Sequence, residues 1–481
     1  MRDLLMRALD TAKTRGATYA DVRVVRSRVQ SISMKNRVVE ALTDNDEIGF
    51  GVRVIANGRW GFASSFRMTL EEADRVAAEA VRIAQASASV PGPDVALDDA
   101  RSITDSYKTP IEKDPFEISF DDRIDLLMRS CDEMLKVKGI LTAEGEIQIQ
   151  RENKTFASSE GSYIEQDLVE TGCGLEAMAV DEGEVQKRSY PNSVGRHQGT
   201  EGWEFIERWD LPGNAGRIAE EAVQLISARP CPPGRTTVIL DGSQVALQIH
   251  ESCGHAIELD RVLGTEAAFA GMSFLTTDKL GNGFKYGSDI VNMTADATIP
   301  GGLGTFGYDD EGVPAQSTPI VRNGEFLGYM TSRETAPIFG QQSNGTARAS
   351  GWNRIPLIRM TNVSIEPGEW NLDDLIADTD DGIYMATNRS WSIDDRRLNF
   401  QFGTEMAYEI KNGKLGDMIK NASYTGITPQ FWGSCDAIGN RDEWVVWGTP
   451  NCGKGQPEQV AHTGHGAAVA RFRDVQVGVM Q

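Results

Sequence analysis

Cysteine is scarce and scattered in this sequence. Its 481 residues include six cysteines, and their positions form no regular framework: Cys131, Cys173, Cys231, Cys253, Cys435 and Cys452. A secreted, disulfide-stabilised protein normally has closely spaced cysteines that pair with one another. The scattered thiols instead indicate a reducing compartment, and we predict a cytoplasmic location.

Basic residues and long apolar runs are also in short supply. Lys and Arg number 48 against 70 Asp and Glu, which gives a net charge of −22. Surfaces that bind nucleic acid or anionic membranes need clustered Lys and Arg, so neither partner is expected. No segment is long and apolar enough to span a bilayer, and the first 16 residues are typical of a charged amphipathic helix rather than a signal peptide.

The chain is too long for one ordinary hydrophobic core, and a stiff connector divides it. The segment RPCPPGR, residues 229–235, contains three prolines and a glycine and cannot continue a helix. We therefore predict two domains in an α+β protein. Residues 1–230 form an N-terminal α/β domain with an antiparallel sheet, and residues 231–481 form a mainly-β domain that carries the metal-site helix.

Local signals support an antiparallel sheet in the first half. Asn57-Gly58 lies between two apolar runs and predicts a two-residue hairpin turn. Thr69 with Glu72, and Ser119 with Asp122, predict the starts of two helices. Residues 141–193 alternate with period two and predict a strand meander, a helix is expected over about 214–228, and the Pro-rich residues 89–118 are expected to be irregular.

The motif HESCGHAIELD, residues 250–260, contains two of the five histidines and organises the functional hypothesis. Neutral imidazoles are common metal ligands, and the adjacent Glu251 could act as a base. His250 and His255 are five residues apart, whereas H-E-x-x-H zinc sites use four. In a regular helix they would point about 140° apart. Both can bind one ion only if the helix bulges or ends near Cys253-Gly254.

A catalytic zinc commonly uses three protein ligands and leaves a fourth position open. Chemistry alone leaves five candidates for the third ligand: Cys452, Cys253, Glu258, His462 and His465. Three ligands from one turn are difficult, which disfavours Cys253, whereas Glu258 lies on the same helical side as His255. The TGHG segment around His465 is more typical of a turn or a substrate-contacting loop, and NCGKG is expected to place Cys452 in a tight turn.

Two acidic clusters are expected to be structural. Residues 309–311, in YDDEG, lack the alternating spacing of a calcium loop and are predicted to form a turn. Residues 394–397, Asp-Asp-Arg-Arg, are predicted to be an ion-paired strand or turn rather than part of a site.

With HESCGHAIELD, YDDEGVPAQ, SIDDRRLNFQFGTEMAYEIKNGKLG and NCGKGQP in view, nearly the whole chain resembles the TldD branch of the TldD/PmbA (TldE) family. The resemblance implies a zinc metallopeptidase in which His250, His255 and Cys452 hold the metal and Glu251 is the general base. It also implies a homodimer, or a heterodimer with a TldE/PmbA-like paralogue, whose enclosed cavity admits short or unfolded polypeptides as an added strand.

Two alternatives to this hypothesis remain open. The chain could be a non-catalytic module that binds peptides or a partner around a structural metal, which would normally have four protein ligands. It could also be a metal-dependent amidase that acts on small molecules, and cleavage profiling on unfolded polypeptides would separate the two enzymes.

Overall fold

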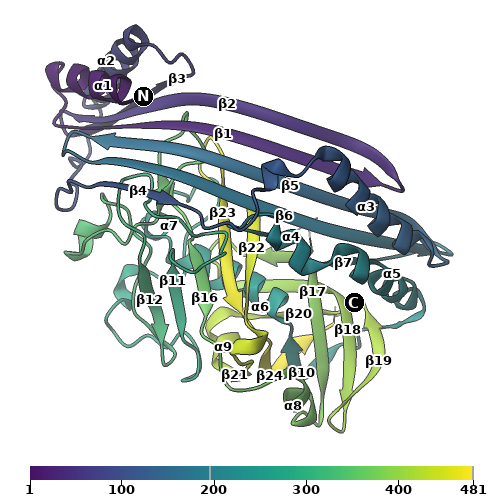
Figure 1. The fold of residues 1–481 in the computed structure, drawn as a ribbon. Helices are drawn as coiled ribbons and strands as arrows, with labels where there is room; N and C mark the ends of the chain where they lie inside the picture. Colours follow the sequence, from purple (N-terminus) through teal and green to yellow (C-terminus); the bar gives the residue numbers. More distant parts are fainter. Residues whose placement is uncertain (194–196, 479–481) are drawn as a thin grey trace.

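The computed structural model describes residues 1–193 and 197–478, which form an α+β fold with three main β-sheets (Figure 1). The long strands of the first half form one layer that lies across the second half of the chain (Figure 1). No helix in the described ranges is long and apolar enough to cross a membrane. The α+β class predicted from the sequence is confirmed.

The first sheet is built from strands of the N-terminal half alone, in the order β3-β2-β1-β5-β6-β4, with β7 and β8 also paired to β6. Its pairs are antiparallel except β4 with β6. The strands are β1 (Tyr19–Lys35), β2 (Val38–Ala56), β3 (Arg59–Ser65), β4 (Thr104–Lys108), β5 (Ile140–Ser158), β6 (Tyr163–Asp181), β7 (Glu184–Tyr190) and β8 (His197–Gly199).

Helices cover one face of this sheet at its two ends. The pair α1 (Arg2–Thr14) and α2 (Leu70–Ser87) lies at one end, and α3 (Phe120–Leu135) with α5 (Leu211–Ser227) lies at the other (Figure 1). Side chains alternate between the faces of a strand. On β1, Val22 packs under the first helix pair and Ile32 under the second. Asp21 and Arg23, on either side of Val22, face the other way and are buried.

Most local predictions for this half are confirmed. Asn57 and Gly58 have φ of 52° and 72°, as a tight hairpin turn requires. Thr69 accepts a hydrogen bond from the Glu72 backbone, and Ser119 caps α3 in the same way. The Glu72 carboxylate does not complete a capping box, because it accepts instead from Ser65 and Arg75.

Two elements of this half were not expected. Strand β4 lies within the segment predicted to be irregular, and α4 (Glu204–Trp209) precedes α5. The sequence of β4, TDSYK, is almost entirely exposed and forms an edge of the sheet. A strand with no buried face has no hydrophobic alternation, so the sequence contained no signal for it.

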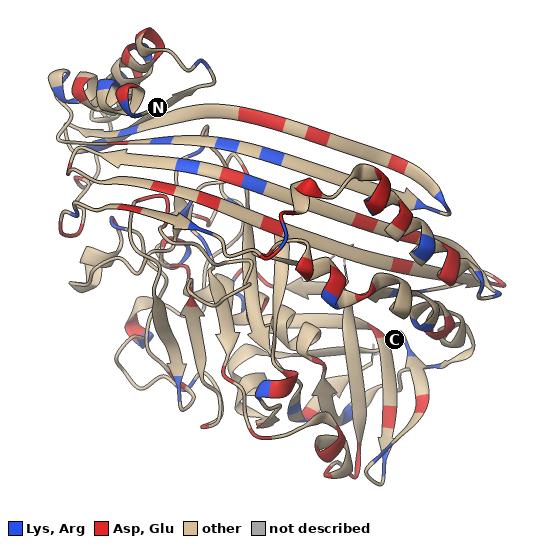
Figure 2. Cartoon of the chain, in the orientation of Figure 1, with Lys and Arg blue, Asp and Glu red and all other residues tan. Residues whose placement is uncertain are grey.

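Charged residues alternate along the long strands of the first sheet (Figure 2). Ion pairs join neighbouring strands, as between Arg26 and Asp46 at 2.6 Å and between Arg28 and Asp44 at 2.9 Å. These pairs are exposed and screened by solvent, so each contributes little to stability. They neutralise much of the positive charge on β1 locally.

The second half contains an eight-stranded and a six-stranded sheet and a short two-stranded pair. The eight strands are β9 (Arg229–Pro230), β10 (Gly234–Leu240), β17 (Asp381–Ile393), β18 (Asn399–Lys411), β19 (Lys414–Lys420), β20 (Ser423–Ile427), β21 (Cys435–Ile438) and β24 (Ala470–Val477). The six are β11 (Met293–Asp296), β12 (Ser317–Arg322), β13 (Glu325–Phe326), β16 (Asn362–Ile365), β22 (Val445–Lys454) and β23 (Gln459–Ala467). The pair is β14 (Ala347–Arg348) with β15 (Leu357–Ile358).

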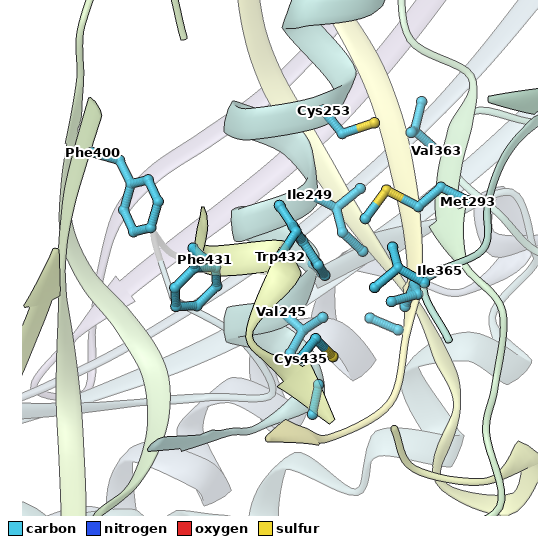
Figure 3. Close-up of a cluster of buried hydrophobic side chains, with 14 of the residues drawn as sticks. Val245, Ile249, Cys253, Met293, Val363, Ile365, Phe400, Phe431, Trp432 and Cys435 are labelled. Atoms are coloured by element: carbon cyan, nitrogen blue, oxygen red, sulfur yellow. The ribbon is translucent and has the colours of Figure 1, made fainter. Parts of the chain in front are cut away.

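Helix α6 (Gly242–Ile249) is held inside the largest hydrophobic cluster, between these two sheets. Figure 3 shows its Val245 and Ile249 beside Trp432 of α9 (Thr428–Gly433), with Met293 and Ile365 of the six-stranded sheet on the other side. Burying a large apolar side chain contributes about 1.5–3 kcal/mol, so this packing fixes the helix firmly. The motif at 250–260 follows directly from its C-terminal end.

Within residues 1–193 and 197–478, no sheet mixes strands from before and after the connector at 229–235, apart from β9 within the connector itself. The largest hydrophobic cluster also draws all its buried residues from position 238 onward. We therefore propose the predicted division into residues 1–230 and 231–481 as the domain boundary.

Buried ion pairs join the two halves at the turn of residues 309–311. The Arg53 guanidinium on β2 lies 2.7 Å from Asp21 and 2.8 Å from Glu311. The other carboxylate oxygen of Glu311 accepts a hydrogen bond from the Arg333 backbone at 2.7 Å. The turn was predicted correctly, but its burial against the first sheet was not, because three consecutive acidic residues are normally solvated.

We predict that Glu311→Gln destabilises the protein by about 3 kcal/mol, because it leaves the buried Arg53 with one carboxylate instead of two. Urea denaturation would measure the loss in the free energy of unfolding. Glu334→Gln is the matched control, since Glu334 is exposed and its bond to the Trp60 indole can be kept by an amide oxygen. Equal stability of the two variants would contradict the prediction.

Candidate metal centre

The helix that carries the motif changes its geometry at the motif. Asp241 caps α6 by accepting from the backbone of Gln244, and the regular helix ends at Ile249. A wide π-helical turn follows over His250–Gly254, and then a 3₁₀ turn over His255–Ile257. The predicted bulge or break near Cys253-Gly254 is confirmed. The wider turn rotates His255 back toward His250, and their ring centroids are 4.9 Å apart.

Gly254 is required by close packing rather than by its backbone angles, since its φ is −53°. A Cβ at this position would lie 2.1 Å from the Met360 sulfur, which is far inside van der Waals contact. The absence of a side chain at Gly254 therefore lets the wide turn pack closely against Met360.

His250, His255 and Cys452 converge on one point. Their ligand atoms all lie within 4.8 Å of one another, and all three side chains are buried. The Cys452 Sγ is 3.6 Å from His255 Nε2. Cys452 is contributed by the last residues of β22, so the expected tight turn is wrong for this residue: the chain turns only after Lys454. The prediction missed the strand because its glycines suggested a loop.

Outer hydrogen bonds orient both imidazoles. His255 Nδ1 lies 3.0 Å from the Glu258 carboxylate, and His250 Nδ1 lies 2.7 Å from His465 Nε2. His465 Nδ1 lies 2.9 Å from the Val363 carbonyl, which can only accept. Burial lowers the pKa of all three histidines, so they are neutral. His465 must then donate through Nδ1 and accept through Nε2.

The same reasoning fixes the tautomers of the two motif histidines. His250 donates through Nδ1 to His465, and His255 donates through Nδ1 to Glu258. Each therefore presents an unprotonated Nε2, with a free electron pair. Outer partners of this kind orient and strengthen metal-binding imidazoles in general.

The third member of the cluster is favoured as a thiolate. Burial alone would raise the pKa of Cys452, but the positive charge of His255, when this ring takes up the proton, and that of Arg359 lower it. The Arg359 guanidinium also donates to the Cys452 carbonyl, which ties the strand to that charge. A thiolate is the form that binds metals.

Glu258 is held as a carboxylate behind His255. It is fully buried, with Arg261 Nε at 3.2 Å and Lys454 Nζ at 3.5 Å. Burial opposes ionisation, but Lys454, His255 and Arg261 together hold its pKa well below the usual value. Lys454 lies two residues after Cys452. The Glu258 carboxylate therefore contacts both His255 and the strand that carries Cys452.

The other candidates for the third ligand lie elsewhere. Glu258 and His465 contact the outer nitrogens of the cluster. Cys253 is buried among apolar side chains near Met293 and Val363 (Figure 3), and burial raises its pKa to about 12. His462 bonds to Glu170 on β6. The structure thus brings together His250, His255 and Cys452, whose role as ligands remains a proposal.

The cluster opens onto a cavity of about 430 Å³, and Glu251 forms part of its wall. The Glu251 carboxylate accepts from Arg397 Nη1 at 2.9 Å. Trp391 and Trp447 supply aromatic walls, and residues 448–453 of β22 line one side. A turn with an ion pair is present at 394–397, but the prediction that it lies outside the site is wrong. Arg397 lines this cavity, and its partner is the motif glutamate, 146 residues earlier. No sequence signal could have indicated that pairing.

A His/His/Cys cluster with a neighbouring glutamate at a cavity wall is typical of metal-dependent hydrolases. Family models agree with that class. Residues 20–84, 113–229 and 233–478 match domain 1, the central domain and the C-terminal domain of the PmbA/TldA metallopeptidases. The chain belongs to this family, the TldD/PmbA family of the sequence resemblance.

Individual relatives support the assignment to this family. A metalloprotease of Methanocaldococcus jannaschii is 32% identical over 87% of this chain and 89% of its own. A zinc metalloprotease TldD homolog of Saccharolobus solfataricus is 23% identical over 88% of this chain and 89% of its own. The crystal structure of TldE from Thermococcus kodakarensis has the same fold, with a TM-score of 0.75 and 17% identity over 98% of this chain and 99% of that one.

We predict that Glu258→Gln weakens metal binding about 10- to 100-fold, because an amide holds the His255 ring less firmly and does not neutralise Lys454. Competition with a chelator would measure the affinity for Zn²⁺. Glu170→Gln is the matched control, since Glu170 is a partly buried glutamate bonded to a histidine, away from the cluster. A similar affinity in both variants would show that Glu258 does not support the site.

Proposed function

We propose that this protein is a zinc-dependent peptidase that cleaves short or unfolded polypeptides. His250, His255 and Cys452 would hold the metal, and Glu251 would be the general base. The observation that carries the proposal is the convergence of two unprotonated nitrogens and a thiolate-favouring sulfur within 4.8 Å, at a cavity wall that also contains Glu251.

The donor set fits zinc. Imidazole nitrogen and thiolate sulfur both suit Zn²⁺, and catalytic zinc sites commonly have three protein ligands. One relative is itself named as a zinc metalloprotease. When bound, zinc would supply Lewis acidity that polarises a carbonyl group and lowers the pKa of a water molecule, and the thiolate would moderate that acidity.

The chain's own residues account for proton transfer and substrate placement. The Glu251 carboxylate would accept a proton from the attacking water and pass it to the leaving amine. Arg397 holds this carboxylate at the wall of the cavity. Strand β22 is the last strand of its sheet, and its residues 448–453 line the cavity. An extended polypeptide could therefore add to β22 as a further strand, a mode that favours unfolded substrates.

The alternatives predict different observations. A structural metal in a non-catalytic binding module would normally have four protein ligands. The contacts of Glu258 and His465 with the outer nitrogens support three ligands and an open position instead. An amidase for small molecules would leave unfolded polypeptides intact, which cleavage profiling would reveal.

We further propose a dimer, formed either by two copies of this chain or with a TldE/PmbA-like paralogue. The fold shared with TldE supports a paralogue of similar shape.

We also propose a cytoplasmic location. The six cysteines are all free, which is compatible with it.

We predict that Glu251→Gln lowers kcat/KM for an unfolded polypeptide about 10²- to 10⁴-fold, because the amide cannot accept the proton of the water. Zinc content, measured by mass spectrometry, should stay at the wild-type level. Cleavage at the wild-type rate by a zinc-loaded variant would rule out Glu251 as the base.

We also predict that Cys452→Ala loses most of its zinc and its peptidase activity, because two imidazoles alone bind the ion weakly. Cys253→Ala is the matched control, since it removes another buried thiol of the same region. Full zinc occupancy in Cys452→Ala would mean that a different residue is the third ligand.

A further inference from the structure

We propose that Arg397 is a catalytic residue whose guanidinium stabilises the negative charge that develops on the scissile carbonyl oxygen. The proposal rests on the peptidase function proposed above and assigns a residue outside the metal-binding motif to the reaction. Its basis is the position of one guanidinium, which contacts the proposed base and lines the proposed substrate cavity.

The chain around Arg397 is built to hold this side chain in place. Arg397 lies in the turn between β17 and β18, with a left-handed φ of 62° that is costly for a residue with a side chain. The Asp394 carboxylate accepts from the backbone of Arg396 and Leu398 within the same turn. Such a conformation persists only when its surroundings enforce it.

The neighbouring segment 271–274 forms hydrogen bonds with the turn and holds it in place. The backbone of Met272 donates to the Asp395 carbonyl at 2.7 Å, and Phe274 donates to the Arg396 carbonyl at 2.8 Å. Gly271 allows this contact, since a Cβ there would lie 2.3 Å from the Asp395 oxygen. These contacts fix the direction in which Arg397 leaves the backbone.

The Arg397 guanidinium has more N–H groups than its hydrogen bonds to described residues use. Its Nη1 donates to Glu251 at 2.9 Å, and its Nη2 donates to the Ala270 carbonyl at 3.3 Å. Its Nε is buried and has no hydrogen-bond partner among the described residues. A guanidinium has five N–H groups in a rigid plane, so a second acceptor can bind beside Glu251 without displacing it.

Arg397 is also the one cationic side chain among the described residues that line the cavity. The remaining polar side chains of the lining are neutral or belong to the cluster and Glu251: Asn192, Ser193, Ser243, Asn388, Ser392, Thr449 and Asn451. Among the residues that the structure describes, Arg397 is therefore the only cation along the wall that can pair with a negative charge formed inside this cavity.

The movement of charge during the reaction matches the position of Arg397. The oxygen of water forms a bond to the carbonyl carbon, and the carbonyl π electrons move onto its oxygen. The water proton moves to Glu251, so the negative charge leaves Glu251 and appears on the carbonyl oxygen. A fixed guanidinium beside Glu251 can pair with the charge in both positions. Fixed donors aimed at a developing oxyanion typically contribute about 10²- to 10³-fold to kcat.

The test uses a phosphinic peptide, which carries a tetrahedral, negatively charged group in place of the scissile amide. Its binding to the zinc-loaded protein would be measured by calorimetry, which requires no turnover. Glu251→Gln imitates the protonated glutamate and should retain binding. Adding Arg397→Gln to this variant should weaken binding about 10²-fold. Adding Arg396→Gln, which removes an exposed arginine one residue away, should leave binding unchanged.

Kinetics of the single variants supply a second measurement. Arg397→Gln should lower kcat about 10²-fold with little change in KM, and Arg397→Lys should recover part of the loss. Equal phosphinate binding by the Glu251→Gln proteins with and without Arg397 would overturn the proposal, as would a loss confined to KM. If the wild type neither cleaves polypeptides nor binds the phosphinate, the proposed function fails, and this assignment fails with it.

Discussion

The separation of five residues between His250 and His255 is the constraint on which the rest of the site depends. A regular helix would send the two rings to different faces, so the chain abandons α-helical geometry at His250 and takes a wide turn. That turn needs a rigid helix before it and a close approach to Met360 beside it. The packing of α6 against Trp432 supplies the first, and the missing side chain of Gly254 supplies the second.

The orientation of the two rings then depends on groups from distant parts of the chain. His465 on β23 and Glu258 near the end of the motif hold the outer nitrogens, while Lys454 links Glu258 to the strand that carries Cys452. The six-stranded sheet, through His465 and Lys454, and the motif itself, through Glu258, therefore hold the cluster in place. The first half of the chain is joined to this assembly through buried charges, such as the pair between Arg53 and Glu311.

Elements with strong local signals could be predicted from the sequence. The Asn57-Gly58 turn, the capped helices and the distortion at Gly254 each follow from residue types next to one another. Strand β4 and the strand at Cys452 could not, because one has no buried face and the other is rich in glycine. The placement of Arg397 beside Glu251 depends on tertiary contacts between segments 146 residues apart, which no local pattern encodes.

The same contrast between local signals and long-range contacts applies to the residues of the site. Spacing alone indicated His250, Glu251 and His255, and it left five candidates for a third ligand. The structure separates these candidates by geometry, because Glu258 and His465 lie at the outer nitrogens and Cys452 lies at the inner ones. Long-range pairing of β22 with β23 brings Cys452 to this place, and pairing of that kind is the feature that sequence periodicity describes least well.

X-ray absorption spectroscopy at the zinc edge of the metal-loaded protein tests the central claim most directly. The account predicts two imidazole nitrogens at about 2.0–2.1 Å, one sulfur at about 2.3 Å and one further light atom that exchanges with solvent. A spectrum without sulfur, or one with four protein ligands, would contradict it.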